Sequence, residues 1–306
     1  MLSVVADLPR RELAARLAGP GLVLRTGPFA NRIRSDIPQL RDGIALLYAD
    51  YPVDAPGGFA DFHLSLQRAG GLRRFFRPQV CFSHEGVSPF KPLPLAQAYP
   101  MFEWVMNWCV SHRAHSYLII HAAVLERHGR AIILPAPPGS GKSTLCAALV
   151  TRGWRLLSDE MTLVRLDDGA VLPLPRPVSL KNESIGIIRA YAPDAVLSPP
   201  VENTNKGTIA HLKAPSASIA RAGDIARPAF IVFPRFEAGA PLTLAPLGKA
   251  RAFMGVAENA FNYQVLGMRG FTALGRLIDA TVAYEFRYSK LDEAVQFFER
   301  LARDGA

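Results

Sequence analysis

The feature that most constrains the fold is the stretch IILPAPPGSGKST at residues 132–144. Residues 132–134 have the apolar, largely β-branched character of a buried strand, and small residues follow them directly. Such residues let backbone N–H groups converge on one point, and a helix that begins immediately afterwards adds its own N–H groups there. From Ala136 to Ser143 the chain matches the phosphate-binding pattern G-x-x-x-x-G-K-[ST] except at its first position. The stretch therefore predicts a strand, a phosphate-binding loop and a helix.

Ala136 stands where this pattern usually has its first glycine. Because an alanine with positive φ costs about 1 kcal/mol or more, the sequence predicts a negative φ there. The alternative is a simple Gly/Ser turn before a helix, but a helix N-terminus repels the cation of Lys142. The residues predicted to contact the nucleotide are Pro138, Gly139, Ser140, Gly141, Lys142, Ser143 and Thr144.

The composition indicates a folded protein that binds anionic partners. With 306 residues, of which 49% are apolar, the chain can form one large domain or two ordinary ones. The net charge of +9 suits nucleotides or an acidic polypeptide. Nucleic acid is disfavoured as a partner, because no dense run of Lys and Arg with interleaved aromatic residues occurs.

The cysteines and the N-terminus favour a soluble cytoplasmic protein. Cys81, Cys109 and Cys146 are odd in number and lack C-x-x-C spacing, which argues against a disulfide framework and a zinc site. The first twenty residues lack the apolar core of a signal peptide. No stretch approaches the unbroken apolar length that spans a bilayer, so no membrane partner is expected.

Proline and glycine punctuation predicts two regions. Residues 1–95 are expected to form a smaller α/β or β-rich region, and the four prolines of 88–100 mark a boundary. Residues 100–306 are expected to form the second domain, with a core at 116–240 and C-terminal helices at 247–304.

Two apolar runs around the dipeptide His-Gly at 128–129 predict a β-hairpin before the loop. With a two-residue turn, Arg127 lies opposite Arg130, because paired positions in an antiparallel hairpin sum to a constant. The same register places His121 opposite Ala136, at the start of the loop. His121 is therefore a candidate active-site residue, with a satisfied core histidine as the alternative.

The residues after the loop predict a helix, KSTLCAALVTR, capped by Gly153, and a second strand, WRLLS. The helix of about eleven residues spans roughly 16 Å, and the strand spans about the same length. A strand–helix–strand crossover therefore returns Asp159 and Glu160 to the phosphate edge. Two carboxylates there can hold Mg²⁺ together with Ser143 and can orient or deprotonate a nucleophile. The alternative is a polar turn that ends the strand.

Together these residues resemble the HPr kinase/phosphorylase superfamily. The string HAAVLERHG, the loop PPGSGKST, the helix end Arg152-Gly153 and RLLSDE occur in the order and spacing of that family. More closely, the chain resembles the branch called HPr-kinase-related kinase A, which has stretches similar to EWVMNWC, RPVSLKNESI and GTIAHLKAP. The resemblance implies an α/β fold with a P-loop kinase core of the HPr kinase and PEP carboxykinase type.

The resemblance also implies a role for each candidate residue, with ATP and Mg²⁺ as cofactors. Lys142 would stabilise the β- and γ-phosphates, and Ser143 would ligate Mg²⁺. Asp159 would accept the proton of a serine hydroxyl, and Glu160 would help to place the metal or the base. His121 would lie near the transferring phosphoryl group.

Two departures limit the resemblance. Glu160 replaces an aspartate of the family, and ESIGII at 183–188 lacks the Arg and the first Gly of the signature linked to reverse phosphorolysis. The expected function therefore includes neither the reverse reaction nor HPr as the acceptor.

The expected function is an ATP- and Mg²⁺-dependent kinase that phosphorylates a hydroxyl group. The resemblance favours a serine of a small protein or peptide, together with a small peptide-chaperone-like partner. Members of the family often form rings, so a homo-oligomer is compatible with the resemblance. A nucleotide-binding regulatory module, an ATPase without a protein acceptor and a kinase for small molecules are the alternatives.

Three segments complete the predictions. The run GIALLYADY at 43–51 is strand-like. Lys181, Asn182 and Glu183 line the cleft, or Asn182 or Ser184 caps a helix. Residues 196–218 are expected to form a long mobile loop that offers three cationic or titratable side chains to an anionic ligand: Lys206, His211 and Lys213.

Overall fold

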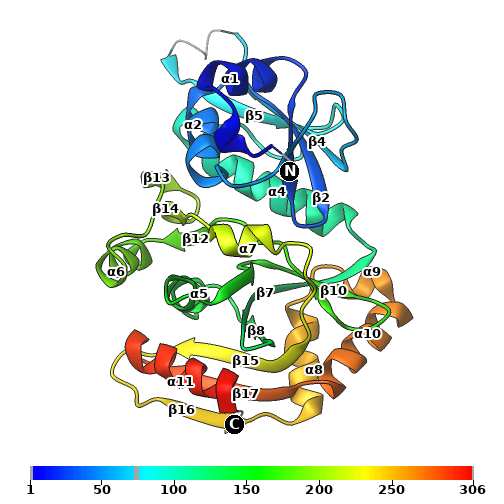
Figure 1. Cartoon of the computed structure of the whole chain (residues 1–306), viewed down its shortest axis with the longest axis vertical. Coiled ribbons are helices and arrows are strands. Elements are labelled where there is room, and N and C mark those ends of the chain that lie inside the picture. The colour runs from blue at the N-terminus through cyan, green and yellow to red at the C-terminus, as the bar shows by residue number, and fades with distance from the viewer. Residues whose placement is uncertain (1–2, 72–75, 305–306) are drawn as a thin grey trace. The chain divides into compact units, whose positions relative to one another are not determined.

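The computed structural model describes residues 3–71 and 76–304. Residues 1–2, 72–75 and 305–306, which fall within the predicted regions 1–95 and 100–306, lie outside the described residues. The chain forms two compact units, one from Met1–Cys109 with Val196–Lys213 and the other from Val110–Ala195 with Ala214–Ala306. Each unit combines helices with β-sheet (Figure 1), which confirms the general α/β class.

The first unit is built on a six-stranded sheet in the order β3-β1-β2-β4-β5-β6. Its strands are β1 (Leu22–Thr26), β2 (Phe29–Arg34), β3 (Val53–Asp54), β4 (Phe62–Arg68), β5 (Gln79–Ser83) and β6 (Leu93–Pro94). Its helical segments are η1 (Val5–Asp7), α1 (Arg10–Ala18), α2 (Pro38–Leu47), η2 (Leu95–Gln97) and most of α4 (Ala98–Arg113).

The run GIALLYADY, which was expected to be a strand, lies largely in α2. Its apolar residues Ile44 and Leu47 continue a buried series from Leu40, with steps of four and three residues. This helical period outweighs the strand-like composition. Gly43 lets the Tyr99 ring approach, since a Cβ on Gly43 would lie 2.1 Å from Tyr99 Cδ2.

The segment at 196–218 is not a mobile loop, so that prediction is wrong. It contains a hairpin of β13 (Val201–Thr204) and β14 (Gly207–Leu212), and α7 (Ser216–Ala220) begins near its end. The Nζ of Lys213 lies 2.8 Å from Asp50, and that of Lys206 lies 5.6 Å from the Trp104 ring centre. His211 is buried. Contacts within the first unit therefore occupy the side chains that were expected to meet a ligand.

The second unit is built on an eight-stranded sheet in the order β11-β10-β7-β8-β15-β17-β16, in which β9 also pairs with β7. Its strands are β7 (Tyr117–Arg127), β8 (Arg130–Pro135), β9 (Arg155–Ser158), β10 (Met161–Arg165), β11 (Val171–Leu172), β15 (Pro228–Phe236), β16 (Thr243–Pro246) and β17 (Val282–Tyr288). A further strand, β12 (Val178–Lys181), precedes α6 (Glu183–Tyr191). Because β8, β15 and β17 are parallel, their C-terminal ends meet at one edge of the sheet.

Helices pack against this sheet as two groups (Figure 1). Leu118, Ile120 and Ile133 form one apolar cluster with α8 (Lys249–Glu258), α9 (Tyr263–Leu266) and α10 (Met268–Asp279). The second group is α5 (Lys142–Thr151) and α11 (Leu291–Asp304), which contact each other and β7. Because successive side chains of a strand point to opposite faces, alternate residues of β7 pack toward one or the other of these two helix groups.

The segment 247–304, which was predicted to form helices, also contains the strand β17, which the sequence prediction omitted. Tyr284, Phe286 and Tyr288 of β17 alternate with other residues at period two, which is the pattern of a strand. Within the described residues, no helix is long and apolar enough to cross a membrane.

Candidate functional site

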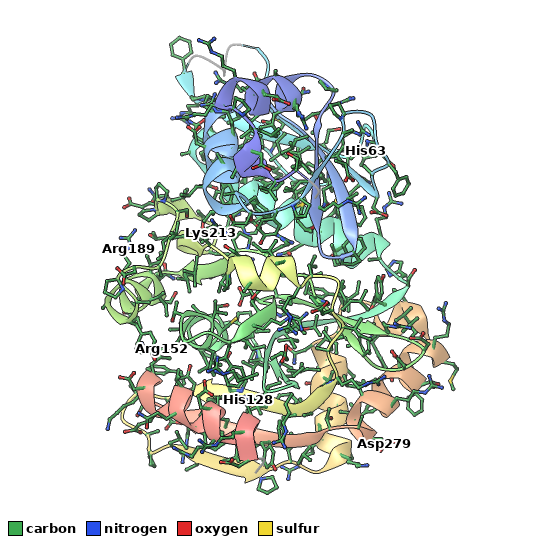
Figure 2. The ribbon with its side chains drawn as sticks, viewed as in Figure 1. His63, His128, Arg152, Arg189, Lys213 and Asp279 are labelled. Atoms are coloured by element: carbon green, nitrogen blue, oxygen red, sulfur yellow. The ribbon has the colours of Figure 1, made fainter. Side chains whose placement is uncertain are left out.

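The β7–β8 hairpin has the predicted register. Arg127 lies opposite Arg130, and the turn residue His128, labelled in Figure 2, has a φ of 53°. The ladder ends one pair before His121 would meet Ala136, because the loop leaves the sheet there. The hairpin therefore brings His121 to the start of the loop.

His121 is only partly buried, and a different segment pairs with its backbone. Its N–H donates to the Asn259 carbonyl at 2.7 Å, and its ring centre lies 5.6 Å from that of Phe261. On its other side it pairs with Met161 of β10. His121 thus lies beside the point where β8 ends and the loop begins, and on its other side it faces β10.

The loop has the backbone conformation of an anion site. Gly139 and Gly141 both have a φ of 86°, which glycine adopts without strain. The φ of Ala136 is negative, as predicted. Helix α5 begins at Lys142, so its first N–H groups and the loop N–H groups can meet one anion.

The ends of two parallel strands hold the loop from the sheet side. The Phe236 N–H donates to the Ser140 carbonyl at 2.9 Å, and the Tyr288 hydroxyl donates to the Gly141 carbonyl at 3.1 Å. A Cβ on Gly141 would lie 2.7 Å from Tyr288 Oη and 2.8 Å from Phe236 Cβ. The sequence prediction missed both aromatic residues. The period-two pattern of β17 was the available signal for Tyr288.

The chain returns from α5 to the loop as predicted. Gly153 follows the helix with a φ of 86°, and its N–H donates to the Val150 carbonyl at 3.1 Å. The Trp154 N–H donates to the Leu149 carbonyl at 3.2 Å, which completes a Schellman motif. The following strand, β9, is antiparallel to β7 and therefore runs in the same direction as β8.

Asp159 and Glu160 form a joint between two strands rather than a free strand end. Both β9 and β10 pair antiparallel with β7, and the pairs made by Ser158 and Met161 keep one register across the joint. The joint therefore lies directly beside β7, whose other neighbour is the strand that leads into the loop.

The opposite charges of Lys142 and Asp159 interact in a buried setting. Lys142 is 6% exposed and Asp159 is 5% exposed. Burial lowers the pKa of Lys142, although the charges of Asp159 and Glu160 oppose this. Burial and the charge of Glu160 raise the pKa of Asp159 to about 6, while Lys142 opposes the shift. The Ser179 N–H donates to Asp159 Oδ2 at 3.0 Å and fixes that oxygen.

Three buried polar atoms of this site lack a hydrogen-bond partner among the described residues: Ser140 Oγ, Lys142 Nζ and Asp159 Oδ1. The Nε atoms of Arg32, Arg127 and Arg155 share this property, but other nitrogens of each guanidinium are bonded. A buried polar atom without a partner costs about 1–3 kcal/mol, so this group of three, at the loop and the acidic joint, indicates a ligand.

The sequence left open whether the residues from Lys181, the last of β12, to Ser184 line the cleft or cap a helix. Lys181 Nζ lies 3.9 Å from Glu160 Oε1, so Lys181 faces the carboxylates. Asn182 precedes α6 with a φ of 51°. Ser184 Oγ donates to the Lys181 carbonyl at 2.6 Å and accepts from its N–H at 2.7 Å. Ser184 thus stabilises the turn that presents Lys181 to the site, and Glu183 begins α6.

Ser143 and Thr144 lie half-buried in the first turn of α5. Across the described ranges, no group of three or more His, Cys, Asp or Glu side chains could hold a metal ion.

The comparisons with known proteins concern the same segment. The model of a family described as SynChlorMet cassette protein ScmC matches residues 97–178. No curated protein matches the chain. The matched residues run from the last residue of η2 to the first residue of β12, and so contain the hairpin, the loop, α5 and the acidic joint.

Proposed function

We propose that the protein is an ATP- and Mg²⁺-dependent kinase that transfers the γ-phosphoryl group to a hydroxyl group. The observation that carries this proposal is the buried Lys142 at the loop, whose Nζ has no hydrogen-bond partner in the described part of the chain. A turn with only a structural role would not bury a cation at a helix N-terminus. In the proposal, the second unit is a P-loop kinase core of the HPr kinase and PEP carboxykinase type.

The loop would hold the phosphates of ATP through backbone N–H groups. The segment from Pro138 to Thr144 contains two glycines in left-handed conformation and the first turn of α5. Both features present N–H groups to an anion. The ammonium of Lys142 would reach the β- and γ-phosphates, which would supply acceptors for its buried donors.

Mg²⁺ would fit between the loop and the acidic joint. The Ser143 hydroxyl and the carboxylates of Asp159 and Glu160 are hard oxygen ligands. When bound, the ion neutralises negative charge on the transferred group. Lys181, at 3.9 Å from Glu160, would limit the negative charge of the joint.

Asp159 would align the acceptor. Because Ser179 fixes Oδ2, Oδ1 remains to accept a hydrogen bond from the acceptor hydroxyl. The hydroxyl oxygen forms a bond to the γ-phosphorus while the bond to the β–γ bridging oxygen breaks; ADP leaves and Asp159 takes the proton. His121, beside the loop, would lie near the transferred group.

The acceptor in this proposal is a serine of a small protein or peptide in the cytoplasm, and a peptide-chaperone-like partner and a homo-oligomer are compatible with it. The net charge of +9 suits an acidic acceptor.

The test incubates the full chain with γ-labelled ATP, Mg²⁺ and lysate of its host, beside the variants Lys142→Ala and Asp159→Asn. We expect a labelled polypeptide that is absent with either variant. The matched controls are Lys249→Ala and Asp279→Asn, which alter an exposed ion pair of the same unit (Asp279 is labelled in Figure 2) and should label normally. Steady ADP release without any labelled acceptor would instead favour an ATPase, and nucleotide binding without turnover would favour a regulatory module.

A further inference from the structure

The strand that leads into the loop has different neighbours on its two sides. On one side of β8 lies β7, and beyond it the joint with Asp159 and Glu160. On the other side lie β15 and β17, both parallel to β8. Ligands of open α/β sheets bind beyond the C-terminal ends of parallel strands. A nucleotide on this loop would therefore have an acidic side and a side formed by the ends of β15 and β17.

The side formed by β15 and β17 carries a row of aromatic rings. Phe236 and Tyr288 are register partners whose ring centres lie 5.7 Å apart. Tyr288 stacks on Phe286 at 5.4 Å, and Phe286 contacts Phe298 of α11 at 5.2 Å. Tyr288, Phe286 and Phe298 are at most 1% exposed, whereas Phe236 is 47% exposed. The buried row thus ends at Phe236, whose ring is exposed.

The exposed ring of Phe236 is fixed against the loop. The Phe236 N–H donates to the Ser140 carbonyl at 2.9 Å, and its Cβ would lie 2.8 Å from a Cβ on Gly141. The neighbouring Tyr288 ring packs against its side and restricts its position. A rigid aromatic face next to a phosphate site offers a stacking surface, because every nucleotide base has a π-face.

The acidic side of the loop and the side formed by β15 and β17 together set the direction in which ATP lies, and this step rests on the proposed function. The γ-phosphoryl group must lie toward Asp159, so the nucleoside must leave the loop on the opposite side. We propose that the base of ATP stacks on the exposed ring of Phe236, at the ends of β15 and β17. Stacking of this kind provides affinity with little preference among bases.

The test compares two ligands that differ by the nucleoside, ATP and inorganic tripolyphosphate. Their dissociation constants are measured by calorimetry for the full chain and for Phe236→Ala. We expect Phe236→Ala to weaken ATP binding by about 5- to 100-fold, which is the range of aromatic stacking on one base. Tripolyphosphate binding should change less than about twofold, and Phe236→Trp should restore ATP binding. Phe271→Ala, at a ring on α10 that is 52% exposed, is the matched control and should bind both ligands normally.

Phe236→Leu keeps the apolar volume without the π-face and provides a second variant if Phe236→Ala does not fold; it should also lose ATP affinity selectively. Equal weakening of ATP and tripolyphosphate would overturn the proposal, because the ring would then only support the loop. Unchanged ATP binding in both variants would overturn it as well. If the wild-type chain binds neither ligand, the proposed function itself fails and this inference fails with it.

Discussion

Alanine substitutions at two glycines of the loop distinguish the energetic cost of backbone strain from that of steric overlap. Gly139 and Gly141 both have a φ of 86°, so an alanine at either position adopts the same unfavourable backbone conformation. A Cβ on Gly139 meets nothing within 4 Å in the described structure, whereas one on Gly141 lies 2.7 Å from Tyr288 Oη and 2.8 Å from Phe236 Cβ. Only the second substitution must displace the strand ends that hold the loop.

The expected losses in the free energy of unfolding follow from these contacts. Gly139→Ala should cost about 1 kcal/mol, because left-handed strain is partly offset by the lower entropy of the unfolded chain. Gly141→Ala should cost about 2–4 kcal/mol, since overpacking adds about 1–3 kcal/mol. In Gly141→Ala/Tyr288→Phe the nearest overlapping atom is absent, so the double variant should lose less than the sum of the two single losses.

Urea unfolding of the full chain measures these losses. Trp154 is 1% exposed and follows α5, so its fluorescence reports on the unit that holds the loop. Trp104 and Trp108 are replaced by Phe in every sample to remove their signal. Equal losses for Gly139→Ala and Gly141→Ala would refute the steric overlap, and additive losses in the double variant would refute the role of the Tyr288 hydroxyl.

Three further predictions concern the same site. Tyr288→Phe leaves the Gly141 carbonyl without its donor, which costs about 1 kcal/mol, so calorimetry should show about fivefold weaker tripolyphosphate binding, with Tyr284→Phe unchanged. Asp159→Asn should lower kcat by about 10²- to 10⁴-fold while ATP binding persists; an unchanged kcat would contradict the role of Asp159 as proton acceptor. The folded-state pKa of Asp159 is raised from 3.8 to about 6, so the protonated carboxyl group of Asp159 stabilises the folded state. This stabilisation is present below pH 3.8 and is lost as the pH rises through 6. Thermal unfolding should therefore show Asp159→Asn to be more stable than wild type at about pH 8, by about 3 kcal/mol, with no gain at about pH 4.

Local signals in the sequence predicted most of the segment that forms the loop. The two-residue turn set the register of β7 and β8, because an antiparallel ladder has a constant sum once its turn is known. Gly153 marked the end of α5, and the matched lengths of helix and strand predicted the return of Asp159. Each of these inferences depends on residues within about one helical or strand length of each other, where propensity and geometry dominate.

Contacts between distant segments could not be predicted in the same way. Tyr288 is 147 residues from Gly141, and their contact depends on the order of β8, β15 and β17 in the sheet. The alternation of one strand indicates its faces but not its neighbours. Residues 196–213 likewise lack a strong local pattern, and their structure depends on partners such as Asp50, which pairs with Lys213.

The site costs stability in the protein without a ligand. Ser140 Oγ, Lys142 Nζ and Asp159 Oδ1 are buried without a hydrogen-bond partner in the described residues, at about 1–3 kcal/mol for each such atom. The opposite charges of Lys142 and Asp159 offset part of this cost. The remainder is a sizeable fraction of the 5–15 kcal/mol, roughly, that holds a domain folded. A loop with only a structural role would be more stable with apolar residues at 142 and 159. A phosphate ligand with a hydroxyl or a cation beside it would satisfy all three atoms together, which supports the proposed function over a simple turn.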